Sequence, residues 1–418
     1  MPGQPPLPAT LPGCHFEPRC AFATDLCRTT PPKLEPIGAS ANGRKASIPH
    51  FARCHHWDQL AKADFAEELK EAFTGIEKEK AAEPAITITN VAISYYRPGL
   101  IDTWMGTPHP PDTVSNINLT VNRGETVALV GESGSGKSTI LRAVSGLLPS
   151  KDGSITFENF DLTTDVDDRP MELRKRIQLI FQNPDASLNP RHSVTEILDQ
   201  PLRLYFPGMS AADRDARKIE LLDRVRLSER YLTRYPGQMS GGEKQRVAIA
   251  RAFAADPEVV LCDEVTSALD VSVQAAVLDL LADLQKEHGT TYIFITHDLA
   301  VVRAFADRVA VLYQGRLCEV GSVDEIYAPP FHPYTETLLG AALEPDPDME
   351  PKLIGGDTPE SRPPAVGCPF QRRCPVRVGP ICDEQMPEWG SPEGARDHNL
   401  RCHIPIKDLF AAQEEAWK

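Results

Sequence analysis

"LVGESGSGKST", residues 129–139, decides the fold of this chain. It follows the β-branched run "TVALV" (126–130) and precedes the helical stretch "ILRAVSGLL" (140–148), so it matches G-x-x-x-x-G-K-[ST] between a strand and a helix. Its glycines let backbone N–H groups converge on phosphate oxygens, and the helix N-terminus adds positive potential. We therefore predict a phosphate-binding loop in which Lys137 reaches the β- and γ-phosphates and Ser138 ligates Mg²⁺.

The sequence around this loop has the pattern of an α/β protein. From about residue 114 to 328, short β-branched runs alternate with helical stretches, which is typical of a parallel sheet. Residues 183–258 are mostly helical and polar, which predicts a helical subdomain inserted into that sheet. Ahead of the loop, "AITITNVAISYY" (85–96) alternates as a strand.

A second strand carries the acidic partners of the loop. "EVVLCDEVTSALD" (258–270) runs through apolar positions into Asp263 and Glu264. Asp263 is placed to hold the magnesium beside Ser138, and Glu264 is placed to polarise a water.

"YPGQMSGGEKQRVAIARAF" (235–253) resembles the signature motif of ATP-binding-cassette (ABC) ATPases. Further motifs of that family follow in order. Gln182 matches the Q-loop, Ser240–Gly242 the signature core, residues 267–270 ("SALD") the D-loop, and His297 the switch histidine. Two motifs depart from the usual pattern: in the signature, Met239 and Glu243 stand where Leu and Gln are common, and after Glu264, Val265 stands where Pro is common.

The resemblance implies a P-loop nucleotide-binding domain over 85–328, with a RecA-like core, an antiparallel β subdomain and the helical subdomain. It also implies a Mg²⁺-dependent ATPase in which two such domains sandwich ATP head to tail. Lys137, Gln182, Glu264 and His297 would be catalytic, and Ser138, Gln182 and Asp263 would hold Mg²⁺. The nucleotide would contact Tyr95 (stacked on adenine), Gly131, Glu132, Ser133, Gly134, Ser135, Gly136, Lys137, Ser138, Thr139, Ser240, Gly241, Gly242 and Asp270.

The C-terminal segment (329–418) indicates a branch of the family. "APPFHPYTETLLGAAL" (328–343) with a Cys-rich tail resembles the extension found on ATPases of oligopeptide and dipeptide importers. Cys368, Cys374, Cys382 and Cys402 follow with the spacing C-x5-C-x7-C-x19-C. The resemblance implies a [4Fe–4S] cluster there, and zinc or no metal are the alternatives. Cys262 and Cys318 lie in strand-like contexts and are expected to be core thiols.

A similar pattern of cysteines lies near the N-terminus of the chain. "GCHFEPRC" (13–20) repeats "GCPFQRRC" (367–374), and Cys14, Cys20, Cys27 and Cys54 have the spacing C-x5-C-x6-C-x26-C. Residues 1–56 thus resemble the extension of a preceding ATPase, as in the second half of a fused tandem protein, with a second iron–sulfur site as an expectation. An N-terminal domain acquired for its own purpose is the alternative. Residues 57–84 predict an amphipathic helical linker.

Bulk properties restrict the function. No apolar run approaches the roughly 20 residues that cross a bilayer, and the N-terminus lacks the pattern of a signal peptide, so we expect a peripheral protein on the cytoplasmic face of the inner (plasma) membrane. The formal net charge of −15 argues against nucleic acid.

The leading hypothesis is the ATP-hydrolysing, energy-coupling subunit of a peptide importer. Its expected partners are a second ABC ATPase domain (homodimer or heterodimer), two transmembrane permeases and, indirectly, an extracytoplasmic binding protein. The alternatives are an iron–sulfur ABC ATPase acting on ribosomes or nucleic acid, and a non-catalytic subunit.

Overall fold

The computed structural model describes residues 12–17, 20, 22–37, 50–57, 83–96, 111–267, 269–342, 366–395 and 397–416. They form two compact units: residues 1–78 with 270–279, and residues 79–269 with 280–418. Most of the predicted linker helix (57–84) lies outside the described residues. Within the described ranges, no helix is both long and apolar enough to cross a membrane.

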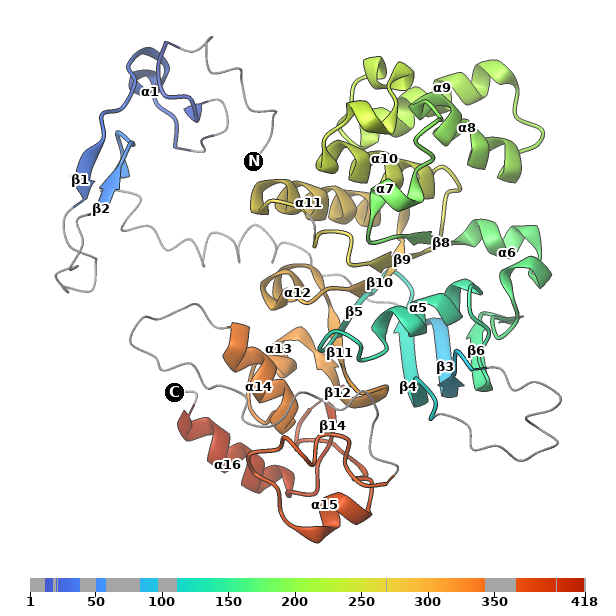
Figure 1. The fold of residues 1–418 in the computed structure, drawn as a ribbon, viewed down its shortest axis with the longest axis vertical. Helices are drawn as coiled ribbons and strands as arrows, with labels where there is room; N and C mark the ends of the chain where they lie inside the picture. The colour runs from blue at the N-terminus through green and yellow to red at the C-terminus, as the bar shows by residue number, and fades with distance from the viewer. Residues whose placement is uncertain are drawn as a thin grey trace. The chain divides into compact units, whose positions relative to one another are not determined.

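The larger unit is built on an eight-stranded sheet with the order β13-β14-β12-β11-β5-β10-β9-β8 (Figure 1). The five strands from β11 to β8 pair in parallel, which confirms the predicted α/β fold around the phosphate loop. Central strands β5 and β10 are buried along their whole length, as expected where helices cover both faces. The strands are β5 (Thr126–Val130), β8 (Ile177–Ile180), β9 (Val259–Asp263), β10 (Thr291–Ile295), β11 (Arg308–Tyr313), β12 (Arg316–Ser322), β13 (Trp389–Gly390) and β14 (Asn399–Arg401).

A second, antiparallel sheet has the order β4-β3-β6-β7. Its strands are β3 (Pro84–Ile93), β4 (Val114–Asn122), β6 (Asp152–Phe157) and β7 (Phe160–Asp161). Apolar side chains of this sheet, of α5 (Lys137–Ser145) and of the main sheet form one continuous core. The helix that follows the phosphate loop is therefore fixed by apolar packing against both sheets.

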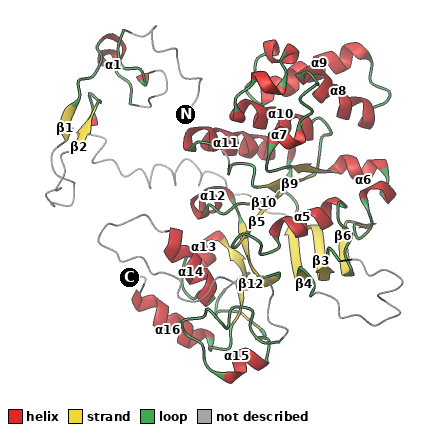
Figure 2. Cartoon of the chain, in the orientation of Figure 1, coloured by secondary structure: helices red, strands yellow, loops and turns green. Residues whose placement is uncertain are grey.

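Residues 184–253 contain the helical group that was predicted between β8 and β9 (Figure 2). Serines begin its three longest helices: Ser193, Ser210 and Ser240 each accept a hydrogen bond from the backbone N–H three residues further on, which is the usual N-cap arrangement. The helices are α7 (Pro184–Ser187), α8 (Val194–Tyr205), α9 (Ala211–Arg224) and α10 (Gly241–Phe253), with 3-10 turns η3 (Glu229–Thr233) and η4 (Pro236–Gln238).

The C-terminal segment is joined to the main sheet. Strand β14 pairs with β12, and β13 extends the same edge. The buried His398 ring bonds the Glu319 carboxylate of β12 at 2.6 Å, and the Gln413 amide bonds both the N–H and the carbonyl of Phe331. The remaining helical elements of this unit are η2 (Val166–Asp168), α6 (Met171–Arg176), α11 (Val271–His288), α12 (Leu299–Phe305), α13 (Val323–Ile326), α14 (Pro333–Ala342), α15 (Pro380–Glu384) and α16 (Ile406–Ala416), of which α11 begins in the smaller unit.

The N-terminal part of the smaller unit is a short helix and a hairpin that the sequence patterns did not predict. Helix α1 (Asp25–Thr29) is followed by β1 (Glu35–Ile37), which pairs antiparallel with β2 (His50–Ala52). Such short elements carry too little periodicity to be read from one sequence.

Candidate nucleotide site

The phosphate loop joins the end of β5 to the start of α5, as predicted. Gly131, Gly134 and Gly136 have φ values of 146°, 80° and 102°, which L side chains rarely adopt. A Cβ on Gly131 would lie 2.1 Å from the Leu312 carbonyl oxygen. Glycine is therefore required both for the backbone angle and for the close approach of β11.

Lys137 lies at the centre of this loop and is 5% exposed. Its ammonium donates to the carbonyls of Gly131 and Glu132, both at 2.8 Å. Burial lowers the pKa of Lys137, while the nearby carboxylates, Glu264 foremost, act in the opposite direction. Lys137 Nζ also lies 3.4 Å from Ser135 Oγ, and a buried cation whose hydrogen bonds go to neutral oxygens is well matched to phosphate, which supplies negative charge.

Ser138 and Asp263 form the pair expected at the magnesium site. The Ser138 hydroxyl donates to Asp263 Oδ1 at 2.8 Å. Burial raises the pKa of Asp263, and the Ser138 hydrogen bond partly offsets that shift. Hydroxyl and carboxylate oxygens are ligands that Mg²⁺ prefers, so the residues present fit this ion.

Glu264 follows β9 directly and adopts a left-handed φ of 45°. Its backbone N–H donates to the Ile295 carbonyl at 3.1 Å, which anchors it to β10. Gln182 Nε2 donates to its Oε2 at 2.8 Å, and His297 Nδ1 lies 3.6 Å from the same oxygen. Three residues predicted from separate motifs meet here because β8, β9 and β10 are parallel and adjacent, so their carboxyl ends share one edge of the sheet.

Tyr95 lies beside the first turn of α5. Its hydroxyl is 3.3 Å from Thr139 Oγ1 and accepts from Arg142 at 3.0 Å. The ring is 53% exposed, which leaves it open to a flat ligand. Stacking on adenine remains a prediction.

Ser240, Gly241 and Gly242 form the N-terminus of α10, within the helical group and away from α5 (Figure 1). Glu243, which departs from the usual signature motif, bonds both to the start of α10 and to η3. Its carboxylate accepts from the Ser240 N–H at 2.8 Å and from the Tyr231 hydroxyl. Burial opposes ionisation, yet these hydrogen bonds prevail and lower the pKa of Glu243. In the D-loop segment, Asp270 Oδ1 accepts from the Val273 N–H at 3.0 Å, and Ala268 lies outside the described residues.

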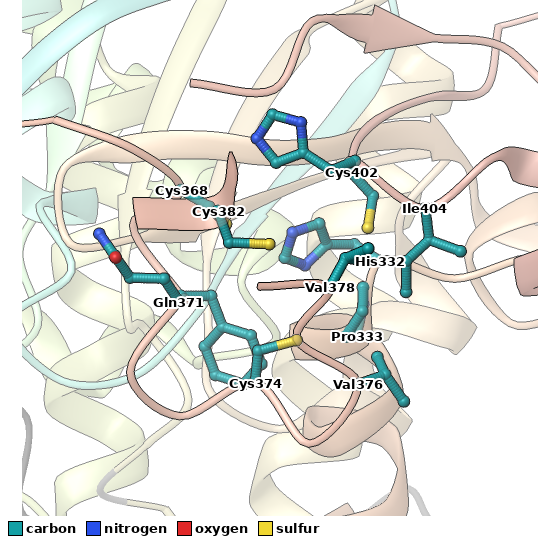
Figure 3. Close-up of a pocket in the computed structure, with 12 residues that line it drawn as sticks. His332, Pro333, Cys368, Gln371, Cys374, Val376, Val378, Cys382, Cys402 and Ile404 are labelled. Carbon is teal, nitrogen blue, oxygen red and sulfur yellow. The ribbon is translucent and has the colours of Figure 1, made fainter. Parts of the chain in front are cut away.

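The C-terminal cysteines line one small pocket, together with His332 and Pro333 from the start of α14 (Figure 3). Burial, together with neighbouring thiols of the set, raises the pKa of Cys368 to about 12 and of Cys402 to about 11. Among the described residues, no group of three or more His, Cys, Asp or Glu side chains is arranged to hold a metal ion. This finding supports neither mononuclear zinc nor an iron–sulfur cluster.

The N-terminal cysteines lie in the smaller unit. Cys27 is buried there, and Cys14, Cys20 and Cys54 are partly exposed. The predicted core thiols Cys262 and Cys318 are buried in β9 and β12 of the larger unit.

Comparison with known proteins agrees with this geometry. The family model "ABC transporter" matches residues 114–267. The chain is 44% identical to the oligopeptide transport ATP-binding protein OppF of Salmonella typhimurium over 300 residues, which cover 70% of this chain and 89% of that protein. The chain belongs to the ABC transporter ATPase family.

Other relatives of this ABC ATPase support the predicted branch. A model of the oligopeptide/dipeptide transporter C-terminal region matches residues 318–382 and, separately, residues 1–27, so the predicted likeness of the two ends is confirmed. A putative peptide import ATP-binding protein of Brucella ovis is 44% identical over 66% of this chain and 87% of its own. Among solved structures, a dimeric ATP-binding cassette in a post-hydrolysis state with ADP and Pi is 32% identical, with a TM-score of 0.50 over 57% of this chain and 98% of its own.

One contact of the nucleotide site of this ABC ATPase was not predicted. Arg373, from the C-terminal Cys segment, forms a bidentate ion pair with Glu132 of the phosphate loop, at 2.8 and 2.9 Å. The Tyr334 hydroxyl accepts from the Glu132 backbone N–H at 2.8 Å. The Cys segment therefore supports the loop directly. The only signal in the sequence was the arginine before the second cysteine of each cassette.

We expect Arg373→Met to weaken ATP binding about tenfold. The substitution leaves the Glu132 carboxylate unpaired beside an incoming triphosphate, and a charged hydrogen bond of this kind is worth about 1.5–3 kcal/mol. Glu132→Gln should restore most of the affinity when combined with Arg373→Met, because the repelling charge is gone. Calorimetric titration of the three variants with ATP provides the measurement.

Arg377→Met is the matched control, because Arg377 pairs with Asp383 at the exposed surface of the same segment. It should change ATP affinity less than twofold. A double variant as weak as Arg373→Met would show that Arg373 acts on the loop by another route.

Proposed function

We propose that this chain is an ATP-hydrolysing subunit of a peptide importer and works as one of two ATPase domains beneath two permeases. The observation that carries the proposal is a single unit in which the phosphate loop and its acidic partners are joined to the segment matched by the oligopeptide/dipeptide transporter model. Names of relatives support the peptide substrate class, and nothing in the comparisons supports the ribosome or nucleic-acid alternative.

Several residues at one edge of the sheet would share the tasks of hydrolysis: phosphate binding, water activation and Mg²⁺ binding. Lys137 and the loop N–H groups would hold the β- and γ-phosphates, and Glu264 would orient and deprotonate the attacking water, with Gln182 and His297 fixing its carboxylate. Ser138, Gln182 and Asp263 would hold Mg²⁺, which neutralises developing phosphate charge. The other loop residues from Gly131 to Thr139 would wrap the phosphates, and Tyr95 would stack on the adenine.

A second ATPase domain would complete the site. Ser240–Gly242 begin a helix that lies away from α5 of the same chain, so this helix N-terminus can face a nucleotide bound elsewhere, while the Ser240 N–H donates to Glu243. A head-to-tail pair would bring them to the γ-phosphate of the partner, with Asp270 near the same interface. The dimeric state of a structural neighbour fits this arrangement.

The domain division that we propose keeps the sequence boundaries. Residues 1–56 are a Cys-rich extension, 57–84 a linker, 85–328 the ATPase domain with its helical subdomain at 183–258, and 329–418 the importer extension. We place the protein peripherally on the cytoplasmic face of the membrane, held by permease contacts.

Photocrosslinking to a permease tests this function. A photoreactive residue at the exposed position 186, in the segment between Gln182 and α8, should crosslink to a cytoplasmic helix of a permease in native membranes. The same residue at Ile219, which is 38% exposed on α9, should give at least about tenfold less product. Crosslinks from position 186 to ribosomal proteins in place of a permease would contradict peptide import.

We also propose that Cys368, Cys374, Cys382 and Cys402 hold a [4Fe–4S] cluster. All four are free thiols that line one pocket, and four cysteine thiols are the ligand set of such a cluster. Ligation by iron would also relieve the cost of ionising buried thiols whose pKa values are raised. The role would be structural, because the pocket lies in the extension.

Anaerobically purified protein should be brown, with broad absorbance near about 400 nm. Cys374→Ser should lose iron and sulfide, because one of the four ligands is gone. Cys20→Ser makes the same test of the second site expected in the N-terminal set, and unchanged iron and sulfide would show that this set is empty in the isolated chain. Iron, sulfide and zinc per chain are measured, and zinc without sulfide would exclude the cluster.

A further inference from the structure

The two Cys-rich segments share one backbone structure. We call residues 12–57 the front cassette and residues 366–403 the rear cassette. The first cysteine N–H donates to the third cysteine carbonyl in both, Cys14 to Cys27 at 2.7 Å and Cys368 to Cys382 at 2.8 Å. The third cysteine is the middle residue of a five-residue helix in both, and a two-stranded hairpin separates it from the fourth.

The histidine after the fourth cysteine repeats as well. His55 Nε2 lies 2.9 Å from the Thr30 carbonyl oxygen, and His403 Nε2 lies 2.8 Å from that of Gln385. Thr30 and Gln385 each stand three residues beyond the third cysteine. The front cassette is thus folded like the rear one, although it belongs to the other unit.

The two cassettes differ in the exposure of one apolar residue. Leu26 and its counterpart Ile381 are both exposed, at 49% and 41%. Phe16 is 46% exposed, whereas its counterpart Phe370 is 1% exposed. A buried aromatic in one copy of a fold and an exposed one in the other marks a contact that the second copy lacks.

The rear cassette shows what that contact is. Phe370 packs on Tyr313, Tyr334 and His332, with ring centroids 5.2, 5.3 and 6.1 Å away. Tyr313 belongs to β11 of the ATPase domain, whereas His332 and Tyr334 lie at the start of α14, in the importer extension but outside the rear cassette. Arg373 then pairs with Glu132 of the phosphate loop. Arg19 has the sequence position of Arg373 in the front cassette and lies outside the described residues.

We infer that the front cassette docks on a second ABC ATPase domain, with Phe16 entering the aromatic pocket that corresponds to Tyr313, Tyr334 and His332. The pocket of this chain is filled by Phe370, and a second copy of this chain would have its pocket filled in the same way. The partner is therefore an ATPase domain of this family whose pocket is not occupied by a cassette of its own. The inference rests on the proposed pairing of two ATPase domains.

Photocrosslinking in the full chain tests the docking. Benzoylphenylalanine replaces Phe16 or, as a matched control, Leu26, in transporter purified from native membranes. Position 16 should crosslink to a second ABC ATPase, at the peptides that carry its equivalents of Tyr313 and Tyr334. Its yield should exceed that of position 26 at least about tenfold, because the counterpart of Leu26 stays exposed in the docked cassette.

Substitution gives a second measurement. Phe16→Ala should lower the amount of the second ATPase that co-purifies about tenfold or more, as for a central interface anchor, and Leu26→Ala less than twofold. Three results would overturn the inference. They are equal crosslinking yields from positions 16 and 26, crosslinks from position 16 to a permease or to residues 308–342 of the same chain, and absence of a second ATPase. Recovery of the permeases in the same preparation is scored separately, so the docking can fail while the importer function stands.

Discussion

Glu264→Gln is expected to reduce ATP hydrolysis by at least about 10²–10³-fold, in the range for loss of a general base. The amide keeps the size of the side chain but takes up no proton from the attacking water. Lys137, Ser138 and the loop glycines are untouched, so ATP binding should persist and the ATP-bound dimer should accumulate. Steady-state phosphate release, nucleotide titration and size-exclusion chromatography with ATP measure the three effects.

Glu172→Gln is the matched control, since it neutralises an exposed carboxylate on α6 away from the nucleotide site. It should leave turnover within about twofold of wild type. Wild-type-like hydrolysis by Glu264→Gln would remove Glu264 from the mechanism, and loss of ATP binding would indicate that the left-handed turn at this residue had been disturbed.

Phe370→Ala is expected to lower the free energy of unfolding of the larger unit by about 3–5 kcal/mol, the range for truncating a buried phenylalanine. It removes a ring that is 1% exposed and packs on Tyr313 and Tyr334. The loss should also free Arg373 from Glu132 and weaken ATP binding. Urea denaturation followed by fluorescence gives the first quantity.

The chain contains its own control in Phe16→Ala. The same residue at the same place in the front cassette is 46% exposed, so its truncation should cost less than about 1 kcal/mol in the isolated chain. Phe370→Leu, which keeps most of the apolar volume, should recover much of the lost stability. Equal costs for Phe16→Ala and Phe370→Ala would contradict the difference in burial that underlies the docking inference.

Much of the nucleotide site was predictable because its chemistry is local. The glycine angles, the lysine and the serine of the phosphate loop lie within nine consecutive residues, and Asp263 and Glu264 directly follow a strand. Parallel strands then bring separate motifs to one edge, so Gln182, Glu264 and His297 could be expected to meet before any coordinates were known.

Contacts between distant segments were not predictable in this way. Arg373 and Glu132 are separated by 241 positions, and the sequence around neither residue predicts the pair. Glu243 appeared as a deviation from a motif, and only the position of Tyr231 and the cap of α10 revealed its bonds. Both depend on packing of whole elements, which fixes the partners of a side chain after the backbone has been assembled.

The two Cys-rich cassettes show most clearly what the sequence determines and what the tertiary structure decides. The sequence by itself determined that both ends of the chain carry the same Cys-rich pattern, because spacing of cysteines, glycine and aromatic residues is a local property. Only the tertiary structure decided that Phe370 is buried while Phe16 is exposed. Burial depends on what lies opposite a side chain, and the aromatic pocket that receives Phe370 is supplied by residues of β11 and α14, outside the cassette.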